Sequence, residues 1–181
     1  MVEKLFISAN QLLEDSYRLG HAILKAGFKP NYIVGVWRGG TPVGIAVQEL
    51  LDYHGVATDH IAIRTSSYDG IENQRDTVQV HGLHYIIENV NAEDNLLIID
   101  DVFDSGRSVQ AVIDTVKRLS RRNAPQMKVA TIYYKPGKRK VEITPDFYLH
   151  ETEKWLVFPH ELHGLTEQEI FDNKPFALGK E

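Results

Sequence analysis

The chain has 181 residues, with 20 Lys and Arg against 25 Asp and Glu, and its lack of cysteine excludes disulfide scaffolds, thiolate metal sites and cysteine nucleophiles. The net charge of −5 argues against broad binding to nucleic acid or to acidic membranes, so neither is expected as a partner. Because no apolar run approaches the roughly 18 residues that span a membrane, and no signal peptide is evident, we expect one cytoplasmic domain over residues 1–181.

Helical and strand patterns alternate along the first half of the chain. Apolar residues at helical spacing predict a helix over 9–26, which Ser8 caps and Gly27 ends. The β-branched run Tyr32–Val36 is typical of a strand buried on both faces. The next expected elements are a helix over 42–53, a strand over 59–64, a polar loop over 65–77, and a strand or hairpin over 78–87.

The second half carries the strongest strand pattern, Leu96–Ile99, which leads directly into Asp100 and Asp101. The elements expected after it are a helix over 106–122, a strand over 128–134, a basic turn over 135–140, a strand over 146–149 and a polar tail over 164–181. This alternation predicts an α/β fold in which helices flank a mainly parallel central sheet.

The junction after the aliphatic run carries the clearest chemistry, because ligands bind where parallel strands end. Backbone amides at the start of the next helix, with Gly106 and the hydroxyls of Ser105 and Ser108, would form an anion cradle. Asp100 and Asp101 would repel a phosphate and instead suit sugar hydroxyls or Mg²⁺ beside it. A phosphorylated sugar fits this set. Ordinary Asp and Ser caps are the alternative, which three acids within five residues disfavour.

A family resemblance is carried by the run LLIIDDVFDSGRS. It is similar to the phosphoribosyl-diphosphate binding motif of type I phosphoribosyltransferases, in which an aliphatic strand and an acidic pair precede Asp-Thr-Gly-x-Thr. Ser105 and Ser108 stand where threonine is usual, and both keep the hydroxyl. The resemblance extends over about residues 30–161 and implies the fold of that family, with a small hood from the terminal segments.

The resemblance also implies a role for each polar residue of this run. Asp104 would be the catalytic acid or base beside the purine N7, while Asp100 and Asp101 would hold ribose hydroxyls, directly or through Mg²⁺. The residues that would bind the 5′-phosphate are Asp104, Ser105, Gly106, Arg107 and Ser108.

The segment from Trp37 to Thr41 resembles the pyrophosphate loop of the same family. Gly39 and Gly40 would let the backbone approach the pyrophosphate, and Arg38 would donate charge-assisted hydrogen bonds to it. Relatives often have a non-proline cis peptide in this loop, so the Trp37–Arg38 bond is a candidate. On its own, Arg-Gly-Gly would equally fit a plain turn.

The polar stretch at Ser67 and Tyr68, with Asn73–Arg75 close behind, resembles the mobile catalytic loop of the 6-oxopurine members. Such a lid closes over the reacting sugar and excludes water. Without the other motifs, a disordered loop would be the simpler interpretation.

Two later segments imply the choice of base. Lys135 resembles the lysine that donates to the exocyclic oxygen at C6, and Trp155 resembles the aromatic residue that stacks on the purine, with backbone groups from Leu156 onward at the C2 edge. An ammonium can only donate, so it favours a 6-oxo over a 6-amino group. Glu161 stands where relatives often have an aspartate for a second Mg²⁺. Without the resemblance, Lys135 would belong to a solvated basic turn and Trp155 to the core.

The motifs together identify the chain as a member of the 6-oxopurine (hypoxanthine or xanthine–guanine) phosphoribosyltransferases. Membership implies transfer of ribose 5-phosphate from phosphoribosyl diphosphate to a purine base, with Mg²⁺ as cofactor and pyrophosphate released. A homodimer or homotetramer is the assembly expected from relatives.

Three alternatives remain at this point. The first is a regulator with the same fold that binds phosphoribosyl diphosphate and a nucleic acid. The second is a type I member that uses adenine, orotate or uracil. The third is a phosphoaspartyl phosphatase or receiver domain with Asp100 as nucleophile, which leaves the Arg-Gly-Gly segment unexplained.

Overall fold

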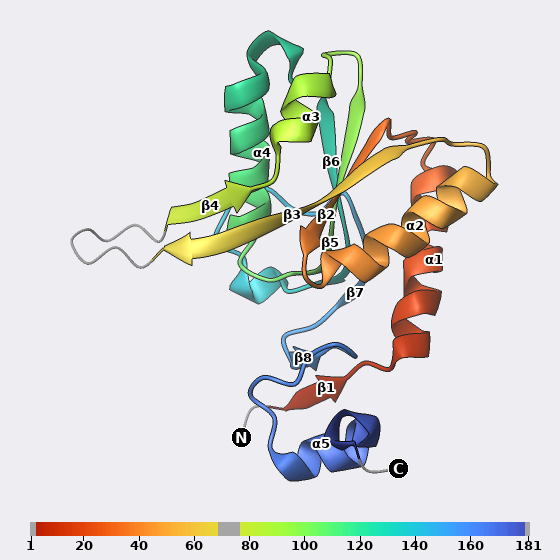
Figure 1. Cartoon of the computed structure of the whole chain (residues 1–181), viewed down its shortest axis with the longest axis vertical. Helices are drawn as coiled ribbons and strands as arrows, with labels where there is room; N and C mark the ends of the chain where they lie inside the picture. The colour runs from red at the N-terminus through yellow and green to blue at the C-terminus, as the bar shows by residue number, and fades with distance from the viewer. Residues whose placement is uncertain (1–2, 69–76, 180–181) are drawn as a thin grey trace. The chain divides into compact units, whose positions relative to one another are not determined.

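A computed structural model of the chain describes residues 3–68 and 77–179 (Figure 1). The chain divides into two compact units, each described here by itself. The larger unit is Leu13–Glu153, and the smaller unit combines Met1–Leu12 with Lys154–Glu181.

A six-stranded sheet forms the centre of the larger unit, with the order β4-β3-β2-β5-β6-β7. The strands are β2 (Tyr32–Trp37), β3 (Asp59–Tyr68), β4 (Thr77–His81), β5 (Asn95–Phe103), β6 (Gln126–Tyr134) and β7 (Phe147–Glu151). Only β4 runs antiparallel to its neighbour, β3. The expected α/β fold with a mainly parallel sheet is therefore confirmed.

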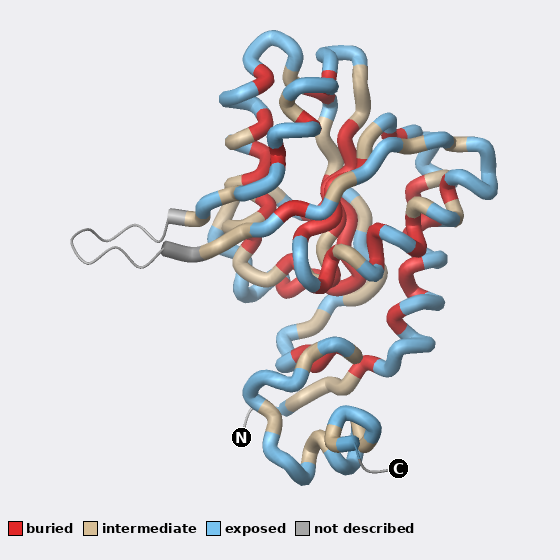
Figure 2. Tube along the Cα trace, viewed as in Figure 1, coloured by how far each residue is buried: buried red, intermediate tan, exposed pale blue. Residues whose placement is uncertain are grey.

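Helices cover both faces of this sheet, α3 and α4 on one side and α1 and α2 on the other (Figure 1). Their bounds are α1 (Ala9–Lys25), α2 (Gly40–Tyr53), α3 (His84–Asn89) and α4 (Arg107–Ser120), with a 3₁₀ turn, η1, at Arg121–Asn123. In β5, Leu96 and Ile98 join the apolar cluster beneath α3 and α4. Leu97 and Ile99 are fully buried on the opposite face, because successive strand side chains alternate. Figure 2 shows this buried layer running through the strands.

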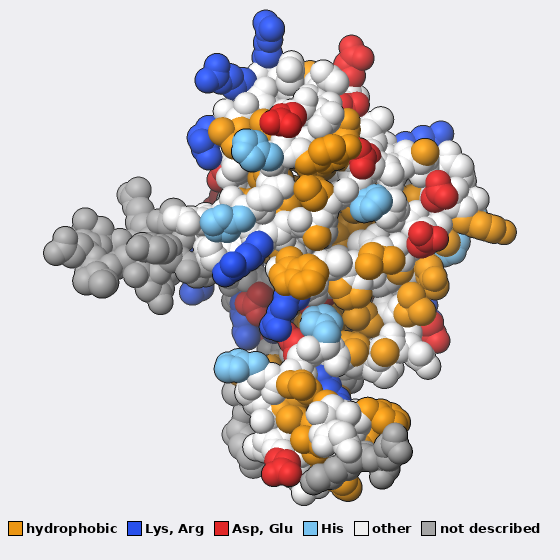
Figure 3. All heavy atoms as spheres, viewed as in Figure 1, with side chains coloured by type: hydrophobic (Ala, Val, Ile, Leu, Met, Phe, Trp, Pro, Cys, Tyr) orange, Lys and Arg blue, Asp and Glu red, His pale blue; other side chains and the backbone are white. Residues whose placement is uncertain are grey.

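The helix ends follow local chemistry. Ser8 Oγ accepts a hydrogen bond from the Gln11 amide at 3.1 Å, which confirms it as the N-cap of α1. Gly27 has φ of +72° and ends the same helix, as predicted. Lys117 and Arg118 lie in the last turn of α4, where they complement the helix dipole. Basic side chains gather at that end of the larger unit in Figure 3.

The structure corrects two of the expected elements in the larger unit. The predicted polar loop over 65–77 begins later, because β3 continues to Tyr68 and its residues pair with β4, for example Thr65 with Val80. The predicted strand or hairpin over 78–87 is strand β4 followed by helix α3. Leu83, Ile86 and Val90 are buried at helical spacing, and this pattern defines α3.

The smaller unit contains elements that were expected only as a polar tail or not at all. Strands β1 (Lys4–Phe6) and β8 (Trp155–Val157) pair in parallel, and helix α5 (Glu167–Asn173) precedes the 3₁₀ turn η3 (Pro175–Leu178). Thr166 and Glu169 form a capping box at the start of α5, with each side chain accepting from the other's backbone amide. None of the helices within 3–68 and 77–179 has the length and apolar character needed to cross a membrane.

Candidate active site

Two adjacent carboxylates lie inside the C-terminal part of β5. Asp101 is buried, Asp100 is partly buried, and the Asp101 amide donates to Asp100 Oδ1 at 3.0 Å. Burial, followed by repulsion from the Asp101 carboxylate, raises the pKa of Asp100 well above its ordinary value, although hydrogen bonds from the backbone of Asp101 and Gly40 oppose the rise. Ionisation of both carboxylates is therefore disfavoured, and a nearby cation would offset their repulsion.

The glycines after β2 pack directly against this pair. Parallel pairing of β2 with β5 brings the ends of the two strands together. A Cβ atom added to Gly39 would overlap the Asp101 carboxylate, and one added to Gly40 would overlap the backbone at Ile99 and Asp100. The loop can approach β5 only because both residues lack a side chain. The Trp37–Arg38 peptide in this loop, which the resemblance marked as a candidate, is cis.

The turn between β5 and α4 presents a helix N-terminus. Gly106 has φ of +77°, and a Cβ atom added there would lie 2.5 Å from the Phe103 ring and from Val141. Ser105 Oγ accepts from the Arg107 amide at 3.4 Å. The first turn of α4 thus directs its backbone amides and the positive end of its dipole toward this turn, an arrangement suited to an anion.

Lys135 meets Asp104 at the ends of β6 and β5. The Lys135 Nζ lies 3.1 Å from Asp104 Oδ2, and the side chain of Lys135 is only 6% exposed against 46% for Asp104. The Lys135 amide donates to the Phe103 carbonyl, and the Lys140 amide donates to the Ser105 carbonyl, both at 2.9 Å. The 3₁₀ turn η2 (Pro136–Lys138) lies between these two bonds. Lys135 is therefore a buried, paired ammonium and not part of a solvated basic turn.

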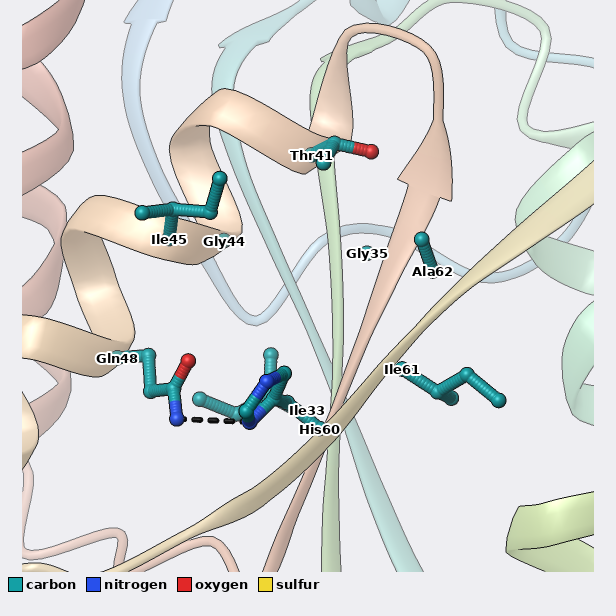
Figure 4. Close-up of a pocket in the computed structure, with 9 residues that line it drawn as sticks. All are labelled: Ile33, Gly35, Thr41, Gly44, Ile45, Gln48, His60, Ile61 and Ala62. Atoms are coloured by element: carbon teal, nitrogen blue, oxygen red, sulfur yellow. Dashed lines mark hydrogen bonds between the residues drawn. The ribbon is translucent and has the colours of Figure 1, made fainter.

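A separate small pocket lies beside the glycine loop, between α2 and the strands β2 and β3 (Figure 4). Its volume is about 80 Å³, and Gln48 Nε2 contacts His60 Nδ1 at 2.7 Å along its wall. Ligand sites usually occupy roughly 300–1,000 Å³, so this pocket is too small for a purine or a sugar phosphate. Gly35, Gly44 and Ala62 in its lining have little or no side chain, which leaves this small space open.

Three further candidate residues belong to the smaller unit and are described within it. Trp155 is 48% exposed at the start of β8, and Leu156 beside it is buried. The Glu161 carboxylate accepts from the Phe158 amide at 3.1 Å, so one of its oxygens closes a turn. Burial lowers the pKa of Lys174, which contacts this turn, and Glu161 opposes the shift. No sequence pattern pointed to Lys174.

The predicted mobile-loop residues Ser67 and Tyr68 end strand β3, where their backbones pair with β4. Their side chains lie outside the described residues, as does Asn73–Arg75.

The carboxylates present suit Mg²⁺ only with help from a substrate. Among residues 3–68 and 77–179, no three His, Asp or Glu side chains gather as a metal-binding group. Mg²⁺ commonly binds through one or two carboxylates together with substrate phosphates, which matches the pair Asp100 and Asp101. The repulsion that raises the pKa of Asp100 is also what a divalent cation would offset. The residues therefore fit this metal.

Comparison with known proteins assigns the family. The family model of the phosphoribosyl transferase domain matches residues 5–164, and the chain belongs to that family. This membership confirms the resemblance seen in the sequence and removes the phosphatase or receiver-domain alternative.

Individual relatives agree with this assignment. The chain is 27% identical over 180 residues to a hypoxanthine-guanine phosphoribosyltransferase of Streptococcus pyogenes, covering 97% of this chain and 92% of that protein. It is 28% identical to the protein of the same name from Lactococcus lactis, covering 97% and 90%. The crystal structure of a purine phosphoribosyltransferase from Pyrococcus horikoshii matches with a TM-score of 0.73 at 27% identity, covering 91% of this chain and 98% of that chain.

Proposed function

We propose that this chain is a purine phosphoribosyltransferase that acts in purine salvage. It transfers ribose 5-phosphate from phosphoribosyl diphosphate to a 6-oxopurine base, which is hypoxanthine, guanine or xanthine, and releases pyrophosphate. The observation that carries the proposal is the 3.1 Å contact between Lys135 and Asp104, placed beside a helix N-terminus suited to phosphate. The names of the relatives in Streptococcus pyogenes and Lactococcus lactis support the same base class.

The phosphoribosyl group would be held at both of its ends. The 5′-phosphate binds the turn Asp104–Ser108, where amides at the start of α4 and the hydroxyls of Ser105 and Ser108 donate to it. At the other end, Arg38 and the amides of Gly39 and Gly40 bind the pyrophosphate. Closure of the segment at Ser67 and Tyr68 would exclude water from the reacting sugar.

The acidic pair would bind the ribose, which lies between these two ends of the phosphoribosyl group. Asp100 and Asp101 accept hydrogen bonds from the ribose hydroxyls, directly or through Mg²⁺, and Glu161 is the proposed protein ligand of a second Mg²⁺. When bound, Mg²⁺ neutralises charge on the departing pyrophosphate. The close approach of Gly39 to Asp101 supports this arrangement, because it brings the pyrophosphate loop next to the sugar-binding acids.

The base would be recognised by donors and by stacking. The ammonium of Lys135 donates to the oxygen at C6, while Asp104 contacts N7 and moves a proton there. Trp155 stacks on the purine, and the backbone from Leu156 onward faces the C2 edge. Lys135 is already held by Asp104 at 3.1 Å, so little reordering of this side chain is needed when the base binds.

The test is a nucleotide-forming assay. The protein is incubated with phosphoribosyl diphosphate and Mg²⁺ against hypoxanthine, guanine, xanthine, adenine, orotate and uracil. We expect nucleoside monophosphate and pyrophosphate in equal amounts with at least one 6-oxopurine. Product only with adenine, orotate or uracil would reassign the base, and no product with any base would overturn the enzyme proposal. Gel filtration during purification tests the proposed homodimer or homotetramer.

A further inference from the structure

One lysine of the smaller unit holds three backbone carbonyls at once. Lys174 follows α5 directly, and its Nζ lies 2.5 Å from the Phe158 oxygen, 3.3 Å from the Pro159 oxygen and 2.5 Å from the Glu161 oxygen. An ammonium has three hydrogens and no acceptor, so this arrangement uses its full donor capacity.

The carbonyls converge because residues 158–161 form a closed turn. The Glu161 amide donates to the Phe158 oxygen at 3.0 Å, and the Glu161 carboxylate accepts from the Phe158 amide at 3.1 Å. Carbonyl dipoles that point to one place repel one another, and a cation at that place offsets the repulsion. The side chain of Lys174 therefore acts as a tethered cation at the centre of the turn.

This turn continues directly from β8, the strand that carries Trp155 and Leu156. The pairing of Lys4 with Trp155 and of Leu5 with Leu156 holds β8 against β1. Lys174 holds the backbone that follows. The segment is thus fixed by a strand partner at one end and by the ammonium at the other.

We propose that Lys174 is a positioning residue for base recognition, which sets the backbone after Trp155 by binding the carbonyls of Phe158, Pro159 and Glu161. This inference rests on the proposed function, in which that backbone faces the C2 edge of the purine. Lys174 does not touch the substrate. Its loss should therefore weaken base binding while the chemical step and the binding of phosphoribosyl diphosphate are retained.

The decisive variant is Lys174→Met, which keeps most of the side-chain volume and removes the donors. We expect the KM for the preferred 6-oxopurine to rise about tenfold, equivalent to about 1.4 kcal/mol, while kcat and the KM for phosphoribosyl diphosphate change by less than about twofold. Lys174→Arg keeps the charge, but its planar donors do not converge on three carbonyls. It should restore base affinity only in part.

A matched control comes from the same helix end. Asn173 Nδ2 donates to the Glu169 carbonyl at 2.9 Å, so Asn173→Ala also loses one bond to the backbone but leaves the three carbonyls on Lys174. This control should leave the KM for the base unchanged. If Lys174→Met does not fold, Lys174→Gln, which removes the charge and retains two N–H donors, is used instead and should still raise the KM for the base, though by less.

The possible results distinguish a failure of the role of Lys174 from a failure of the proposed phosphoribosyltransferase function. A wild-type protein that forms nucleotide, with variants whose constants for both substrates change equally or not at all, would overturn the role of Lys174 alone. Wild-type protein that forms no nucleotide with any base would overturn the proposed function, and the inference with it.

Discussion

Lys135 and Asp104 differ greatly in exposure although they form one ion pair. The side chain of Lys135 is 6% exposed and that of Asp104 is 46% exposed. A buried ammonium without a partner is costly, but water partly screens the half-exposed Asp104 carboxylate, so its loss should cost less than the about 3–5 kcal/mol typical of a fully buried pair. Asp104 therefore has a structural task as well as its proposed chemical one, and the two tasks must be separated by experiment.

Asp104→Asn keeps the shape of the side chain and a hydrogen-bond acceptor while it removes the charge and the basic oxygen. We expect kcat to fall by about 100-fold or more, the range for loss of a general acid or base, with little change in the binding of phosphoribosyl diphosphate. Steady-state kinetics with both substrates varied measures this. Asp114→Asn in α4, whose carboxylate accepts from Gln110 Nε2 at 2.9 Å, is the control. Equal losses in turnover and in sugar binding would contradict the acid–base role.

Lys135→Ala should chiefly damage base binding. The proposed donor to the C6 oxygen is lost, so the KM for a 6-oxopurine should rise by about 10-fold to 100-fold, as expected for loss of a hydrogen bond to a charged group worth about 1.5–3 kcal/mol. The affinity for phosphoribosyl diphosphate should remain, since the backbone of Lys135 still donates to Phe103. Unchanged base affinity, measured kinetically or by calorimetry, would refute the assignment.

Asp100 should lower the stability of the folded chain at neutral pH. Its pKa is raised by burial and by Asp101, so the folded protein keeps a proton where the unfolded chain has released it. Stability is therefore lost as the pH rises from the ordinary Asp value of 3.8 through the raised pKa.

The asparagine in Asp100→Asn cannot ionise, so this variant should not lose stability through this group as the pH rises. Without Mg²⁺ or substrate we expect its Tm near neutral pH to exceed that of the wild type by about 2–4 °C, for a gain on the order of 1 kcal/mol. The difference should shrink in acid, while affinity for phosphoribosyl diphosphate falls. Thermal melts across pH measure this, and a Tm difference that is constant with pH would be inconsistent with it.

At the scale of elements, the contact between the glycine loop and β5 is the tightest feature of the site. Gly40→Ala would force its Cβ into backbone at Ile99, which cannot shift as a side chain can, and should cost about 1–3 kcal/mol. Gly39→Ala would displace the Asp101 carboxylate and should weaken binding of phosphoribosyl diphosphate. Denaturant unfolding and substrate titration measure the two effects.

Gly44 in α2 provides the matched control for these substitutions. A Cβ atom added there would have only the Gly35 Cα, at 3.9 Å, within 4 Å. Because alanine favours helix over glycine by about 0.5–1 kcal/mol, Gly44→Ala should be neutral or stabilising and fully active. A loss as large as that of Gly40→Ala would show that the clash is not the cause.

The sequence allowed most elements to be predicted, and the misses have physical causes. The aliphatic run of β5 was evident, but the strand continues through Asp100 to Phe103 because pairing with β6 extends to Tyr134. The strand continuation to Tyr68 likewise depends on pairing with a partner. Helix α5 was not predicted, because few apolar residues follow its start. The capping box formed by Thr166 and Glu169 was the one sequence signal that could have indicated it.

The site was predictable where its residues are contiguous and not where they meet through the fold. The run from Asp100 to Ser108 carries its chemistry in one segment, so its pattern could be read directly. The contact between Lys135 and Asp104 arises because β5 and β6 are neighbours, and only the family resemblance pointed to Lys135. Lys174 had neither a local pattern nor a resemblance to mark it.

At the scale of the whole molecule, the two compact units differ in internal support. The larger unit has a six-stranded sheet with helices on both faces, whereas the smaller contains a two-stranded sheet of three-residue strands. Two strands alone are marginally stable, and α5 has seven residues with none of them buried. Local unfolding should therefore occur more readily in the smaller unit than in the larger one.

Hydrogen–deuterium exchange read by mass spectrometry tests this difference. We expect peptides from 155–173 to exchange about tenfold or more faster than those from β5 and β6, since weakly supported elements open at low free energy. Equal protection throughout would show that both units open together, as the prediction of one domain over 1–181 requires. This exchange experiment therefore also tests the prediction of one domain over 1–181.

Two backbone hydrogen bonds, from Lys135 to the end of β5 and from Lys140 to the turn after it, constrain how the proposed base preference can be redesigned. A grafted segment over 135–140 can change every side chain, but it must keep an amide hydrogen at both of its ends. Proline at either end would leave the carbonyl of Phe103 or Ser105 without its donor. If this loop binds the base and the turn after β5 binds the 5′-phosphate, as proposed, a swap intended only to alter the base would then also weaken binding of the sugar phosphate. On the proposed function, base preference can therefore be changed through the side chains of 135–140, while the backbone hydrogen bonds of this segment must be kept for the binding of both substrates.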